Sequence, residues 1–154
     1  MEEITFNEII SYAKIAEENA KSFYLNAAEE MEQRNVKEYL ETLAAEEQTH
    51  INRLEALQKT IQSRGEVPDL HSEIRSLGYA DFIKAAELGK DASYKDVLVV
   101  AMSNEKEAIR NYDNFSRFID NEEAKKLFTV LADEERRHLK RFEEEYDELQ
   151  DQNY

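Results

Sequence analysis

Two Glu-x-x-His motifs are the residues of this chain whose types and spacing point most directly to chemistry. Each motif places a carboxylate and an imidazole one helical turn apart on the same face of a helix. A further Glu lies 30 residues before each motif, and the second set of three follows the first at a constant offset of 88 residues. The six residues are Glu17, Glu47, His50, Glu105, Glu135 and His138. Inward Glu on two helices, with Glu-x-x-His on two others, is the ligand set of dimetal sites in four-helix bundles.

The repeat also includes residues outside this set. At the same offset, further positions carry identical residues, among them Ala13 and Ala101, Ala20 and Ala108, Tyr24 and Tyr112, Leu43 and Leu131, Ala44 and Ala132, Glu46 and Glu134, and Arg53 and Arg141. The chain therefore reads as a doubled helical hairpin. Common descent of the two halves would explain the repeat without a metal. It does not explain why carboxylates and imidazoles interrupt the apolar stripe of the helices in both halves.

The elements that must position these residues are helices. Apolar residues recur every three or four positions in four long segments, and capping patterns at Thr5, Asn35, Ser93 and Asn121 mark their starts. The second segment is expected to end near Ser63. The connection between the first two segments is short, so these two helices should be antiparallel neighbours.

The segment from 64 to 92 differs from the rest of the chain. It contains the only Pro and all three Gly, with a short helix expected over 79–88. We interpret it as a crossover that spans the length of the bundle. Two hairpins joined by one long crossover predict an all-α, ferritin-like four-helix bundle.

Composition and charge narrow the function classes. A net charge of -15 argues against nucleic acid or an anionic membrane as a partner. No apolar run approaches the length of a transmembrane helix, which is about 18 residues or more. The acidic start of the chain lacks the basic, then apolar, pattern of a signal peptide. The absence of Cys excludes disulfides and thiolate chemistry. We therefore expect a single domain over residues 1–154, located in the cytoplasm.

Four carboxylates in one core are untenable unless they are paired or bound to metal. Two divalent ions would balance their charge, and a mixed oxygen and imidazole shell favours iron or manganese over zinc. Tyr24 and Tyr112 lie two turns after the upstream Glu, where they could donate hydrogen bonds to ligand carboxylates. The alternative is that they are core aromatics whose hydroxyls are satisfied elsewhere. Glu46 and Glu134 lie one residue off the inward position, which favours a solvated face.

Two segments carry a resemblance to a known family. Glu105-Lys106-Glu107-Ala108-Ile109-Arg110-Asn111-Tyr112 and Leu131-Ala132-Asp133-Glu134-Glu135-Arg136-Arg137-His138 resemble the di-iron domain of rubrerythrins, in the ferritin-like superfamily. The resemblance implies two iron ions, for which manganese or zinc could substitute, held by the six residues. Glu47 and Glu135 would bridge or chelate the ions. It also implies reduction of hydrogen peroxide with electrons from a rubredoxin-type centre, and a homodimer.

Two departures from the family pattern modify these expectations. Without Cys the chain has no rubredoxin module, so the electron donor must be another molecule. Rubrerythrins often carry a second carboxylate one turn after the third-helix Glu, where this chain has Ala108. The leading hypothesis is a di-iron oxidoreductase that reduces hydrogen peroxide or dioxygen. The alternatives are a ferroxidase or iron-storage bundle, and a helical interaction module whose buried carboxylates are protonated or paired with Arg.

Overall fold

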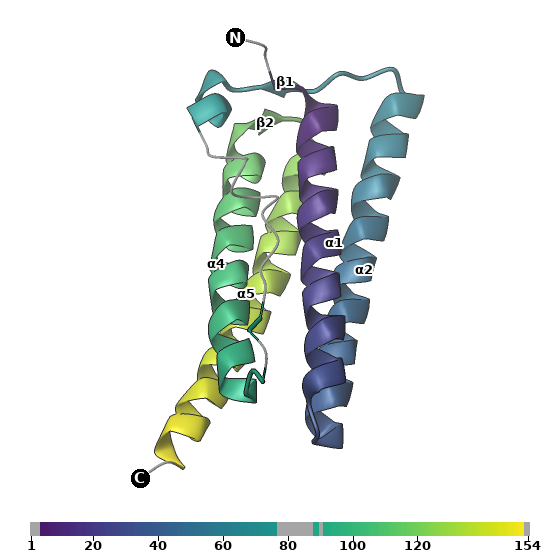
Figure 1. Ribbon diagram of the computed structural model, residues 1–154. Helices are drawn as coiled ribbons and strands as arrows, with labels where there is room; N and C mark the ends of the chain where they lie inside the picture. Colours follow the sequence, from purple (N-terminus) through teal and green to yellow (C-terminus); the bar gives the residue numbers. More distant parts are fainter. Residues whose placement is uncertain (1–3, 77–87, 90, 153–154) are drawn as a thin grey trace.

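Four long helices form the fold in a computed structural model, which describes residues 4–76, 88–89 and 91–152. They are α1 (Phe6–Glu30), α2 (Arg34–Ser63), α4 (Tyr94–Phe118) and α5 (Glu122–Asp151). Helices α1 and α2 pack as one antiparallel pair, and α4 and α5 form the second pair beside it (Figure 1). The predicted all-α four-helix bundle is confirmed.

Three of the four predicted helix starts are confirmed by their caps. The Thr5 hydroxyl accepts a hydrogen bond from the Glu8 backbone N–H at 3.1 Å. Ser93 and Asp96 form a complete capping box at the start of α4. The Asn121 side chain accepts a hydrogen bond from the Ala124 N–H at 2.9 Å. Each cap satisfies a backbone donor that the first helical turn leaves unpaired.

The predicted start of the second helix at Asn35 is wrong. Helix α2 begins at Arg34, after Gln33, which makes no side-chain capping hydrogen bond. The connection from α1 is only three residues long, and its first residue, Met31, is buried. The Lys37 amino group donates to the Ala28 carbonyl at the end of α1, at 2.7 Å. The tight, anchored turn therefore leaves no room for a separate cap at Asn35.

The crossover begins where the sequence predicts. Helix α2 ends at Ser63, and Gly65 follows in the left-handed region with φ of 67°. A two-residue strand, β1 (Asp69–Leu70), then pairs antiparallel with β2 (Ile119–Asp120), and a short 3-10 helix, η1, covers Ser72–Ser76. This strand pair was not predicted. The helix expected over 79–88 lies outside the described residues except for Leu88. Helices α2 and α4 end and begin at opposite ends of the bundle, as a crossover requires (Figure 1).

The core consists of two apolar clusters with a polar layer between them. One cluster lies toward β1 and β2 and is built around Ile9, Leu54, Phe115 and Phe128. The other lies toward the opposite end and is built around Phe23, Leu40, Leu98 and Phe142. The layer between them holds the buried charged side chains Glu17, Glu47, His50, Glu105, Glu135 and His138. The bundle therefore brings all six candidate ligands to the same level.

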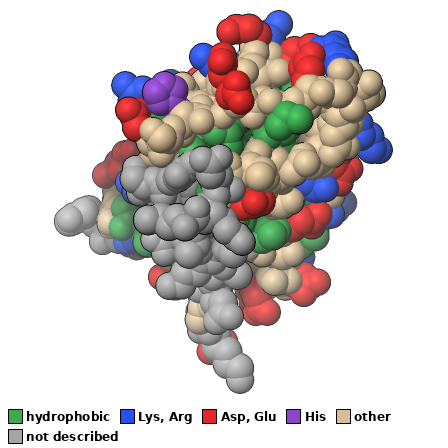
Figure 2. Space-filling view, turned by 90° about the horizontal axis from the view of Figure 1, so that it is seen from above, with side chains coloured by type: hydrophobic (Ala, Val, Ile, Leu, Met, Phe, Trp, Pro, Cys, Tyr) green, Lys and Arg blue, Asp and Glu red, His purple; other side chains and the backbone are tan. Residues whose placement is uncertain are grey.

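The surface carries interspersed charges. Viewed from the end where β1 and β2 lie, acidic and basic side chains alternate around the rim, with a few hydrophobic side chains between them (Figure 2). Among the described residues, no helix combines the length and apolar character needed to cross a bilayer.

Candidate metal centre

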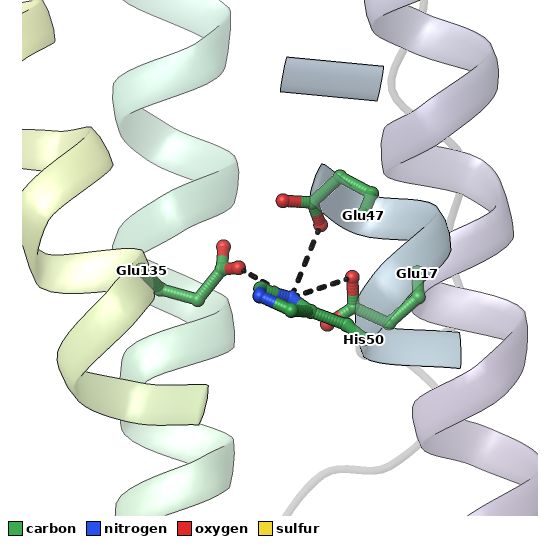
Figure 3. A group of neighbouring side chains, drawn as sticks. All are labelled: Glu17, Glu47, His50 and Glu135. Atoms are coloured by element: carbon green, nitrogen blue, oxygen red, sulfur yellow. Dashed lines mark ion pairs between the residues drawn. The ribbon is translucent and has the colours of Figure 1, made fainter. Parts of the chain in front are cut away.

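All six candidate ligands converge in the polar layer. Helices α1 and α4 contribute Glu17 and Glu105, and α2 and α5 contribute the two Glu-x-x-His motifs. They form two groups in which one potential ligand atom of each residue lies within 4.8 Å of the others. The first group, here the His50 position, contains Glu17, Glu47, His50 and Glu135 (Figure 3). The second, the His138 position, contains Glu47, Glu105, Glu135 and His138. Glu47 and Glu135 belong to both.

The same ring nitrogen of each histidine faces the carboxylates. His50 Nδ1 lies 3.0 Å from Glu135 Oε1, 3.4 Å from Glu17 Oε2 and 4.0 Å from Glu47 Oε2 (Figure 3). His138 Nδ1 lies 3.5 Å from Glu47 Oε1 and 3.7 Å from Glu105 Oε1. The two rings are nearly parallel, with centroids 6.4 Å apart. Both Nδ1 atoms are therefore directed at the shared carboxylates.

The opposite nitrogen of each histidine contacts a carboxylate from the facing helix. His138 Nε2 hydrogen-bonds to Glu46, and His50 Nε2 lies 3.5 Å from Glu134 Oε2. Glu46 is exposed, as expected for a solvated face, and Glu134 is partly exposed, but both also contact a histidine of the layer, which was not predicted. A carboxylate beside Nε2 favours a proton on that nitrogen, and in the neutral ring Nδ1 is then the electron-pair donor available to a metal. The sequence signal for this role was the recurrence of both residues at the 88-residue offset.

Tyr24 and Tyr112 each contact a Glu of the polar layer on the opposite side of the bundle. The Tyr24 hydroxyl of α1 donates to Glu105 Oε1 of α4 at 2.5 Å, and the Tyr112 hydroxyl of α4 donates to Glu17 Oε1 of α1. Burial and then the nearby carboxylates raise the pKa of both phenols well above the ordinary value. Both tyrosines therefore stay protonated donors, and each engages one oxygen of its Glu.

The orphaned polar atoms of the layer test whether a metal fits. Six buried ligand atoms have no hydrogen-bond partner: Glu17 Oε2, Glu47 Oε1, His50 Nδ1, Glu105 Oε2, Glu135 Oε1 and His138 Nδ1. Within the described part of the chain, no Lys or Arg pairs with the four Glu of the layer. This disfavours an interaction module in which Arg neutralises the carboxylates. The unsatisfied atoms are electron-pair donors of the types that bind iron or manganese, so the residues fit a metal.

The charge of the layer acts most strongly on the shared pair. Burial, together with the neighbouring carboxylates, raises the pKa of Glu47 and of Glu135 well above the ordinary value. Burial alone would also raise the pKa of Glu17, but its interactions with Glu47, His50 and Tyr112 lower it instead. Without cations, protons therefore collect on Glu47 and Glu135. A metal ion would have to displace them.

Comparison with known proteins agrees with this geometry. The family model described as Rubrerythrin matches residues 8–146, which include α2 and α4, most of α1 and α5, and all six residues of the layer. Comparisons with curated proteins and with solved structures give no significant match. Membership of this family implies iron binding, and the buried Glu and His cluster supplies donors for a metal. The chain belongs to the rubrerythrin family.

Proposed function

We propose that this protein is a non-haem di-iron oxidoreductase that reduces hydrogen peroxide, or dioxygen, with electrons from an external donor. The observation that carries the proposal is the pair of four-residue groups that share Glu47 and Glu135. Because the two groups of potential ligands share two residues, they would provide two metal positions a short distance apart. Four carboxylates would balance two divalent ions, and each position would receive one imidazole.

The residues divide into shared and separate ligands. Glu47 and Glu135 would bridge or chelate both ions, since each belongs to both groups. Glu17 and His50 would complete one position, and Glu105 and His138 the other. Two iron ions bound there would supply two electrons for cleavage of one O–O bond.

The surrounding residues hold the ligands in place. Tyr24 donates a hydrogen bond to one oxygen of Glu105, and Tyr112 to one oxygen of Glu17, while the second oxygen of each carboxylate has no hydrogen-bond partner. Glu46 and Glu134 orient the histidines from outside. The apolar clusters above and below the layer exclude bulk water. Low dielectric surroundings strengthen every charge interaction inside the layer.

A second candidate function is that of a ferroxidase or iron-handling bundle. The observation that favours it is Ala108, which packs against the apolar cluster one turn after Glu105. A methyl group at this place leaves the centre with four Glu and two His. The native metal under this candidate is also iron, and the six ligands are the same.

Stopped-flow oxidation separates the two functions. The protein is loaded with ferrous iron under argon and mixed with equal concentrations of hydrogen peroxide or dioxygen. A peroxide reductase is expected to be oxidised faster by peroxide and to turn over repeatedly when a reductant is added. Oxidation by dioxygen at an equal or higher rate, without turnover on peroxide, would favour the ferroxidase. Replacing Ala108→Glu should shift the preference toward peroxide if that position sets it.

A further inference from the structure

A pocket of about 470 Å³ lies between α2 and α5 and reaches the His138 position. The residues that line it include Tyr39, Thr42, Glu46, Arg137, His138 and Arg141. A water molecule takes up about 30 Å³ in the liquid, so the pocket has room for several molecules of that size. It therefore connects the surface with the outer edge of the centre.

The corresponding edge of the His50 position is covered. Arg53 binds Glu134 at 2.6 Å, and Glu134 in turn lies against His50. Arg141 is the repeat equivalent of Arg53, but its guanidinium lies 3.8 Å over the Tyr39 ring. The repeat equivalent of Tyr39 is Leu127, which offers no aromatic face for a cation–π contact. Tyr39, together with Glu145, whose Oε2 lies 3.8 Å from Arg141 Nε, therefore holds Arg141 away from Glu46, and the His138 side stays open.

The exposed fractions of the side chains also differ between the His50 and His138 sides. His50 is 1% exposed and His138 is 9% exposed. The Glu134 side chain is 23% exposed, whereas that of Glu46 is 48% exposed. Solvent therefore approaches the centre from the His138 side.

The charge of the pocket indicates what passes through it. Glu38 and Glu46 line it together with Arg137 and Arg141, so acidic and basic groups balance. The two guanidinium groups and the two carboxylates offset each other, so an ion that enters loses hydration without a net attraction to compensate for it. An uncharged molecule does not carry this hydration cost, and it finds hydrogen-bond donors and acceptors along the wall.

We propose that this pocket is the entry port through which a small uncharged oxidant, of the hydrogen peroxide type, reaches the centre at the His138 position. The proposal rests on the proposed oxidoreductase function. Access through the pocket is a property of the protein alone, however, and it is measurable without metal.

Single-cysteine variants test access directly, because the natural chain has no Cys. Leu43 lines the pocket, and Leu131 is its repeat equivalent; they are 2% and 0% exposed. The thiols of Leu43→Cys and Leu131→Cys are reacted in the metal-free protein with an uncharged methanethiosulfonate. Burial alone predicts similar slow rates, whereas an open port predicts that Leu43→Cys reacts about tenfold faster or more. Equal rates, with thermal melts showing both variants folded, would overturn the port.

Reagent charge tests the class of molecule. Cationic and anionic methanethiosulfonates should react with Leu43→Cys more slowly than the uncharged reagent, after correction for their rates with a free thiol. A cationic reagent that reacts fastest would overturn the uncharged-oxidant proposal in favour of a metal-ion entry port.

A plug tests the port in the iron-loaded protein. Thr42→Trp places an indole in the pocket, and Val130→Trp is the matched control at the equivalent exposed position. Thr42→Trp should slow oxidation of the ferrous protein by peroxide about fivefold or more, in line with obstructed access, and should slow labelling of Leu43→Cys. Val130→Trp should change neither rate. If peroxide does not react with the wild type, the proposed function fails while the labelling result still decides the port. If the plug slows neither rate, the port is contradicted.

Discussion

The His50 and His138 sides of the centre consist of residues related by the same 88-residue offset, but their surroundings differ. The inner residues match in type and in direction: each side has one Glu, one His through Nδ1, and a Tyr from across the bundle. The outer residues match in type only. Arg53 closes over Glu134, while Arg141 turns to Tyr39. The buried Glu, His and Tyr match because an unpaired charge is costly to bury. The contacts of the two Arg residues differ because neighbouring residues differ between the halves, as Tyr39 and Leu127 do.

The largest expected effect is the loss of metal binding when a Glu that belongs to both groups is removed. Glu47→Ala removes a carboxylate from both metal positions, so both ions should bind much more weakly. The loss of affinity should exceed the roughly 10–100-fold that is typical when a residue next to a metal ligand is mutated. Glu17→Ala should weaken only the His50 position and leave one ion per chain. Cobalt(II) titration followed by absorption gives both stoichiometries. If Glu17→Ala also loses both ions, Glu47 has no special role.

The next effect concerns the outer carboxylates. Glu134→Gln should weaken metal binding at the His50 position about 10–100-fold, because a carboxylate beside Nε2 of a metal-binding His tunes its orientation and basicity. Arg53→Met should act on the same side through Glu134. Arg141→Met should leave metal affinity unchanged, because Arg141 does not pair with Glu46 in the structure.

Two single-position backgrounds make this measurement specific. Glu105→Ala retains the complete His50 position, and Glu17→Ala retains the complete His138 position. Metal affinity is then measured for Arg53→Met in the first background and for Arg141→Met in the second. Equal losses from both Arg changes would show that the outer contacts of the two sides are equivalent after all.

Some features of the centre and of the fold are predictable from the sequence, and others are not. The six residues of the layer and the starts at Thr5, Ser93 and Asn121 were predictable, because helical periodicity and capping are local properties. The contacts of Glu46 and Glu134 were not, because they form between facing helices and depend on how α2 and α5 cross. The β1–β2 pair also escaped prediction, since two-residue strands carry no alternating pattern.

The smallest expected effect is on the stability of the metal-free protein. The pKa of Glu47 is raised in the folded state, so the folded protein holds this proton more tightly than the unfolded chain. The free energy of unfolding should then fall as pH rises from about the ordinary carboxyl range, near 4, through the raised pKa. Glu47→Gln removes this loss and should melt a few degrees higher than the wild type at pH 8, since ~1 kcal/mol shifts the melting temperature by roughly 2–4 °C.

Glu17 should affect the pH dependence of the free energy of unfolding in the opposite direction from Glu47. Its pKa is lowered in the folded state, so its carboxylate stabilises the protein at neutral pH and this contribution is lost on acidification. Glu17→Gln should therefore melt lower than the wild type at pH 8 and approach it at low pH. Melting curves of both variants between about pH 3 and 8, without metal, test the contrast, because the Glu17 contribution is lost only below the ordinary carboxyl range near 4. Shifts of the same sign would contradict the charge distribution described for the layer.

The number of metal ions per chain tests the central claim most directly. Metal-free protein is titrated anaerobically with ferrous iron, and bound iron is measured by elemental analysis after removal of free metal. Two ions per chain are expected for the wild type, because two groups of four potential ligands share Glu47 and Glu135. One ion per chain, or none, would contradict the dimetal centre.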